Sequence, residues 1–175
     1  MRKTTLEDPF YERLHTFLSA TEGETDRGRS LIAASLIEEM LEEVLRGFLL
    51  ENPATKKLFD DPNAPLSTLS AKASASRALG LITMEEFKDI ELVRKIRNAF
   101  AHSVTCSFKD NKIKDWASSL KTGMSDLDGL KKGHKSRVDD PNQRFGMVTT
   151  SLVTSLYNRA HYVKKERLVD RSWQI

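Results

Sequence analysis

The chain has 175 residues, one cysteine and a formal net charge of +3. That length allows one domain with a continuous apolar core, so neither disulfides nor a structural metal is needed. The single Cys106 excludes an intrachain disulfide, and no stretch approaches the roughly 18 apolar residues of a membrane span. Because the N-terminus also lacks the apolar segment of a signal peptide, we expect a cytoplasmic protein with no membrane partner and no metal or other cofactor.

Apolar residues at helical spacing dominate the first half of the chain. Asp8-Pro9 predicts the start of a first helix, because an N-cap is followed there by proline at the first helical position. A long second helix is predicted from about Asp26 to Glu51, with a wide apolar stripe opposite an acidic face. Asn52-Pro53 should end it, and the stretch to Pro65 reads as a loop with room for one short turn of helix. The apolar residues are Phe10, Leu14, Phe17 and Leu18 in the first helix, and Leu36, Ile37, Met40, Leu41, Val44, Leu45 and Phe48 in the second.

Cap signals define two further helices. One, rich in alanine and serine, is predicted from about Ser67 to Leu79, with Gly80 as its left-handed cap. Thr83 and Glu86 have the spacing of a capping box and open the next helix. Its apolar residues are Phe87, Ile90, Val93, Ile96 and Phe100.

The rest of the chain holds one long helix and less regular segments. The run from Ser103 to Phe108 allows at most an edge strand, a short helix is expected near residues 113–120, and residues 122–140 are predicted to form a mobile loop. Asp140-Pro141 starts the last long helix. We therefore predict a single all-α domain over residues 1–175, an antiparallel helical bundle of four main helices plus short additional ones. The inner face of the last helix consists of Phe145, Val148, Leu152, Leu156, Ala160 and Val163.

The segment from Arg97 to His102, at the end of the helix that Thr83 opens, carries the most chemistry in the chain. On a helical wheel of about 100° per residue, Arg97 falls inside the apolar arc. Arg94 and Lys95 have Glu91 one turn earlier as a partner, but no acidic residue stands at that spacing before Arg97. This arginine must find its anion elsewhere.

Two interpretations of Arg97 follow, because an unpaired charge at a packed face is costly. Either a carboxylate reaches it, as the nearby Glu86 and Asp89 would allow, or its guanidinium opens onto a cavity that takes a phosphate. His102 lies at the helix C-terminus, where the last carbonyl groups favour its protonated form. The residues alone leave two possibilities open. In the first, Arg97 forms an ion pair between helices and His102 caps its own helix; in the second, the two residues form a site for phosphate chemistry.

Three segments carry a resemblance to known families: Ala78-Leu79-Gly80-Leu81-Ile82, Glu85-Glu86-Phe87-Lys88-Asp89 and Ile96-Arg97-Asn98-Ala99-Phe100-Ala101-His102. Within the last, an arginine, a polar residue, three more residues and a histidine at a helix end resemble the signature of the HEPN superfamily. From about Leu66 to Phe108, the chain more closely resembles the mannitol operon repressor-like (MltR-like) family. The HEPN resemblance implies a bundle of helices.

The two resemblances imply different functions. Many HEPN proteins are metal-independent endoribonucleases of toxin or defence systems, which would make His102 the general acid or base, Arg97 the neutraliser of phosphate charge and Asn98 the residue that orients them. That resemblance also implies RNA as the target, a homodimer that joins two such sets, and an antitoxin or regulatory partner. Arg94 and Lys95 would add contacts to nucleic acid. The MltR-like resemblance instead implies a transcriptional regulator that binds DNA or a partner protein without catalysis.

The chain departs from each family at one point. Val104 stands where some HEPN toxins carry a tyrosine, and no helix-turn-helix is recognisable, so a repressor of this kind would need a partner or an unusual DNA surface. The sequence leads us to expect an RNA-directed endoribonuclease, with the regulator as the alternative.

Overall fold

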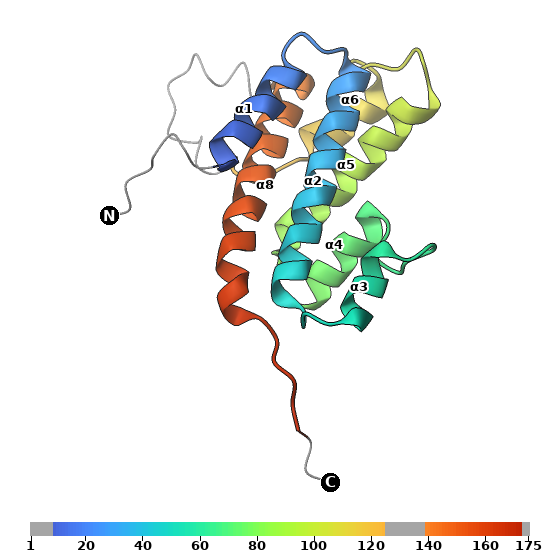
Figure 1. The fold of residues 1–175 in the computed structure, drawn as a ribbon. Helices are drawn as coiled ribbons and strands as arrows, with labels where there is room; N and C mark the ends of the chain where they lie inside the picture. Colours follow the sequence, from blue (N-terminus) through green and yellow to red (C-terminus); the bar gives the residue numbers. More distant parts are fainter. Residues whose placement is uncertain (1–8, 125–138, 173–175) are drawn as a thin grey trace, which may run out of the picture.

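The structure, a computed structural model, describes residues 9–124 and 139–172. These residues form α-helices and one short 3-10 helix, with no strand among them, which confirms the predicted all-α bundle (Figure 1). Most of the predicted loop over 122–140 lies outside the described residues. The elements are α1 (Pro9–Thr21), α2 (Asp26–Phe48), α3 (Pro53–Asp60), α4 (Leu69–Ala78), α5 (Met84–His102), α6 (Asn111–Ser118), α8 (Pro141–Val163) and the 3-10 helix η2 (Lys164–Glu166).

The starts of the helices follow from local cap chemistry. In five of the described helices, the N-cap side chain accepts a hydrogen bond from a backbone N–H three residues later, which satisfies a donor that the helix leaves unpaired. The predicted capping box of α5 is present in full. Gly80 adopts a φ of +72° after α4, as predicted for a left-handed cap. The five N-caps are Thr25, Asn52, Thr68, Thr83 and Asp140.

The bounds of α4 and α6 differ from the prediction by one or two residues, and the end of α2 and the stretch after it differ more. α2 ends at Phe48 instead of Glu51, because Leu49 turns into an extended conformation with a ψ of 160°. The stretch after it, predicted as a loop with one short turn of helix at most, contains the eight-residue α3, because Asn52 caps a helix in which Pro53 occupies the first turn. The same Asn-Pro pair therefore stops one helix and starts the next.

The two longest helices, α2 and α8, lie side by side and run in the same direction (Figure 1). At their starts, the Asn142 side chain donates to the Asp26 carboxylate over 2.8 Å. At the other end of the pair, the N–H of Leu168, which follows α8 and η2, donates to the carbonyl of Phe48, the last residue of α2, over 2.8 Å. The bundle is thus of mixed direction, and the predicted antiparallel arrangement is wrong for this pair, because helical periodicity does not fix the direction in which two helices pack.

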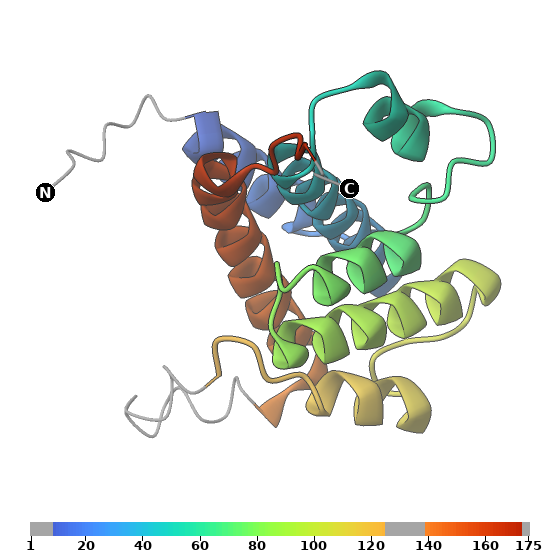
Figure 2. The same cartoon turned by 90° about the horizontal axis from the view of Figure 1, so that it is seen from below.

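α5 runs opposite to both long helices, because its first turn contacts the end of α8 and its last turn contacts the start of α2. α4, α5 and α6 form a row against the α2 and α8 pair, and Figure 2 shows these three helices side by side. α5 is the middle helix of the row. Its position leaves one face toward the core and another toward solvent.

The core fills the space between the α2 and α8 pair and the row. All the predicted inner residues of α8 are buried, as are those of α5 apart from the half-buried Phe87. In the α2 stripe, only Leu36 and Phe48 are partly exposed. In α1, Phe17 is buried and Leu18 is exposed, whereas the side chains of Phe10 and Leu14 lie outside the described part. No described helix is long and apolar enough to cross a membrane.

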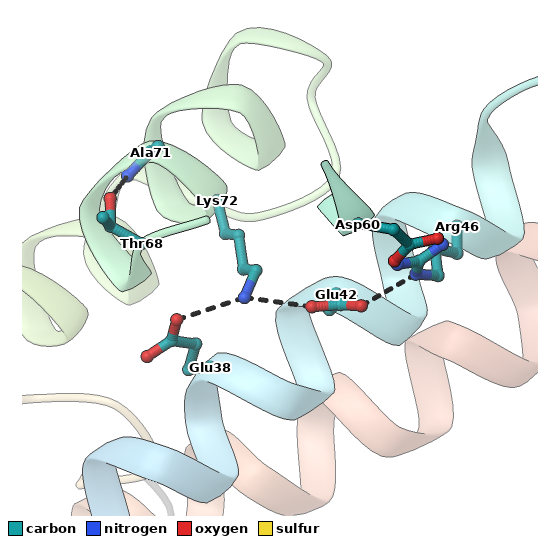
Figure 3. A network of polar contacts seen from close by, with 7 residues as sticks. All are labelled: Glu38, Glu42, Arg46, Asp60, Thr68, Ala71 and Lys72. Carbon is teal, nitrogen blue, oxygen red and sulfur yellow. Dashed lines mark hydrogen bonds and ion pairs between the residues drawn. The ribbon is translucent and has the colours of Figure 1, made fainter. Parts of the chain in front are cut away.

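A chain of charged side chains joins α2 to α3 and α4 (Figure 3). The Lys72 ammonium, on a residue only 6% exposed, lies between Glu38 at 3.1 Å and Glu42 at 3.0 Å. Arg46 contacts Glu42 on one side and Asp60 of α3 on the other. α3 buries no residue completely, and it is attached to the bundle by the Arg46–Asp60 contact and by Phe59, which packs against the core with the Arg46 guanidinium 4.3 Å from its ring centroid.

Candidate functional site

α5 presents the predicted site through its last turn and a half. Ile90, Val93, Ile96 and Phe100 are fully buried and fix the rotation of the helix about its axis. The residues between them must then point sideways or outward. Arg97 and Asn98 are half-buried, and His102, the last residue of α5, is exposed.

Arg97 has no carboxylate within ion-pair distance among the residues that the structure describes. Its Nη1 donates to the Asn98 side-chain oxygen over 3.2 Å. Neither of the two carboxylates that the sequence placed nearby reaches it. Glu86 accepts two hydrogen bonds from Arg159, and Asp89 accepts from the backbone N–H of Lys121 and of Thr122 and from the Thr122 hydroxyl. Those two acids serve the packing of α8 and of the turn after α6.

The Glu86 carboxylate is ionised at neutral pH despite its burial. Burial alone would raise its pKa, but the hydrogen bonds from Arg159 and Thr83 outweigh that cost and hold the pKa below its ordinary value. Its charge is thereby fully engaged at the α5 N-terminus, where the helix dipole also favours an anion.

The carbonyl groups at the end of α5 have partners other than His102. The Ser103 N–H and the Cys106 thiol donate to the Ala99 carbonyl, and Arg27 of α2 donates to the Ala101 carbonyl over 3.4 Å. His102 makes no hydrogen bond within the described residues, so its imidazole is available to a ligand. Sequence reasoning missed Arg27, because nothing local links residues 74 positions apart.

The two basic residues predicted to contact nucleic acid are in different states. Arg94 binds Glu91 at 2.7 Å, and this hydrogen bond raises its pKa further above its ordinary value. Lys95 is exposed and has no partner among the described residues. The structure thus brings Arg97 and Asn98 together, leaves His102 and Lys95 open to solvent, and commits Arg94 to a neighbour.

Fold and site together define an all-helical bundle with a polar, partly open helix end. No family model and no curated protein matches the chain. Among solved structures, a chain of the MtlR–HPr complex from Escherichia coli is similar, with a TM-score of 0.57 and 22% identity. The match covers 89% of this chain and 98% of that chain. MtlR is the mannitol operon repressor, and at this identity the similarity shows a shared fold.

Proposed function

We propose that this protein is a cytoplasmic regulator of the mannitol operon repressor-like kind, which acts by binding a partner protein or DNA without catalysis. The observation that carries the proposal is the similarity to MtlR along nearly the whole of both chains. That structure contains MtlR in a complex with HPr, so a protein of this fold can form a stable assembly with another protein. Because no helix-turn-helix is recognisable in this sequence, we favour a partner protein over direct reading of DNA.

Two binding measurements test the proposal. Isothermal titration of the purified chain with HPr from the same organism should show saturable binding. A gel-shift assay with upstream DNA of the neighbouring operon, with and without HPr, then shows whether DNA is bound alone, with the partner, or not at all. If neither HPr nor DNA binds, the regulator is excluded.

A second candidate function is cleavage of RNA by the Arg97, Asn98 and His102 set. The observation in its favour is that Arg97 has no carboxylate among the described residues, while the His102 imidazole is exposed on the same helix end. Arg97 would neutralise phosphate charge and His102 would transfer the proton, with Asn98 holding the guanidinium. A homodimer that brings two such sets together would complete the site.

The RNA candidate is tested without added metal. Single-stranded RNA should be cut in EDTA, and His102→Ala should slow cutting by on the order of 10² to 10⁴. Arg97→Ala should also slow it, with the helical circular dichroism unchanged in both variants. Light scattering at high micromolar concentration would show whether a dimer exists. RNA that stays intact with the wild-type protein rules this candidate out.

A further inference from the structure

A groove of about 620 Å³ lies on the outer side of α5, beside the turn that follows α6. Apart from the buried Asp89, the residues that line it are exposed or half-buried. Ser119 and Lys121 close its far side. The volume falls within the roughly 300–1,000 Å³ of pockets that bury a drug-sized ligand, so the groove has room for a few side chains of a bound segment.

The floor of the groove is apolar and partly fixed. Phe87 and Leu92 are half-buried and pack against the core, so their positions are set by the fold. Met84 lies at the edge with 49% of its surface exposed. Methionine and aromatic side chains are frequent where one protein surface receives another.

The rim carries an excess of unpaired positive charge. Lys88, Lys95 and Lys121 are exposed, and none of their ammonium groups has a partner among the described residues. Two acids in the lining are already engaged, since Asp89 accepts from the turn at residues 121–122 and Glu91 binds Arg94. Glu85 is the one lining carboxylate left without a described partner.

Resting on the proposed regulatory function, we infer that this groove docks an acidic, partly apolar segment of the partner protein. Apolar side chains of that segment would cover Phe87 and Leu92, and its carboxylates would meet the three lysines. A protein segment fits better than nucleic acid. A phosphate backbone has no apolar group to cover Phe87 and Leu92, whereas a protein segment can supply apolar side chains and carboxylates together.

Chemical-shift mapping on the ¹⁵N-labelled 19.9 kDa chain tests the inference with two defined probes. One is a helical peptide of leucine and glutamate, and the other replaces each glutamate with lysine. The acidic peptide should shift the signals of residues 84–95 and 119–121, and should bind more weakly as salt is raised. The basic peptide should leave those signals unchanged.

Charge reversal sharpens the same test. The double variant Lys88→Glu with Lys95→Glu should bind the acidic peptide with a Kd at least about tenfold higher. The matched control is Lys56→Glu with Lys57→Glu, which makes the same change of charge on exposed residues of α3 outside the groove and should leave binding unchanged. Equal losses in both variants would mean attraction to overall charge, and would overturn the inference.

The remaining outcomes also decide. The inference would be overturned if the acidic peptide caused no shifts or if the basic peptide bound more strongly. It would also be overturned if single-stranded RNA shifted the signals of this face, or if the chain associated with itself through it. Titrating HPr into the same sample separates the two proposals. If HPr binds but shifts signals elsewhere, the proposed regulatory function is supported and the docking groove is ruled out. If HPr and operator DNA both fail to bind, the proposed function and the docking groove are both ruled out.

Discussion

Arg159 on α8 donates two hydrogen bonds to the Glu86 carboxylate on α5, at 2.9 and 3.0 Å. Glu86 is 5% exposed and is also half of the capping box at the start of α5. One carboxylate therefore joins the end of the last helix to the beginning of the helix that carries the candidate site. A substitution that breaks this contact should therefore lower the stability of the fold and also shift the position of α5.

Replacing Arg159 with methionine should lower the free energy of unfolding by about 3 kcal/mol, because Glu86 would stay buried and charged without its partner. Urea denaturation measures this. The matched control is Arg94→Met, whose ion pair with Glu91 lies within one helix and is more exposed, and which should cost less than about 1 kcal/mol. Equal costs would contradict a special role for the Arg159 contact.

Stability should fall on acidification partly through Glu86. Its pKa is lowered in the folded state, so its contribution is complete above the ordinary value of 4.5 and is lost as the pH falls through the folded pKa. Unfolding free energies between neutral pH and about pH 3 would show the decline. Glu86→Gln should flatten part of this acid limb, and an unchanged slope in that variant would be evidence against the assignment.

Lys72→Met should destabilise the protein by about 1–3 kcal/mol, since it leaves Glu38 and Glu42 facing the vacated position without their shared cation. Both carboxylates keep some exposure, which limits the cost. Lys57→Met on the surface of α3 serves as the control and should change stability by less than about 0.5 kcal/mol. Thermal or urea unfolding that ranks the two variants in the opposite order would refute the network's importance.

Two glycines should respond to alanine in opposite directions. Gly80 has a φ of +72°, which a side chain disfavours, so Gly80→Ala should cost about 1 kcal/mol. Gly146 lies inside α8 with open space where a Cβ would stand, so Gly146→Ala should stabilise by about 0.5–1 kcal/mol. The melting temperatures of the two variants should fall on either side of that of the wild type.

Arg97→Ala should change the free energy of unfolding by less than about 1 kcal/mol, because no described carboxylate would be left without its cation. Urea denaturation beside the Arg159→Met variant provides the scale. A loss near that of Arg159→Met would mean that Arg97 is a structural arginine. RNA binding at two salt concentrations, measured on the same variant, would show whether the guanidinium contributes a phosphate contact.

Local chemistry explains which parts of the fold could be predicted. The capping box at Thr83, the glycine cap at Gly80 and the start at Pro141 are each encoded within four residues, and all three are confirmed. The α3 helix was predicted only as one short turn within a loop, because its apolar residues are few and its contact with Arg46 comes from another helix. The parallel packing of α2 and α8 is likewise invisible to periodicity, which identifies a buried face but not the helix that covers it.

In the candidate site, too, features set by nearby residues could be predicted and contacts between distant elements could not. The helical wheel put Arg97 inside the apolar arc, and the structure has its side chain half-buried, but the wheel could not tell which carboxylates already had partners. Glu86 and Asp89 are engaged by Arg159 and by Thr122, residues from other elements that no local pattern connects to them. Lys88 precedes Lys95 by two helical turns, so its place on the outer face could have been read from the sequence, whereas Lys121 comes from another element.

The parallel pairing of α2 and α8 constrains when the molecule can assemble during its synthesis. The apolar stripe of α2 receives its main cover from a helix that lies beyond residues 49–140 in the chain. Until that helix has left the ribosome, the apolar stripe of α2 lacks its main cover, and the earlier helices leave an apolar surface exposed to solvent. The last helix to be made is thus the one that closes the core, and a chain that stops before Pro141 should aggregate instead of forming a smaller bundle.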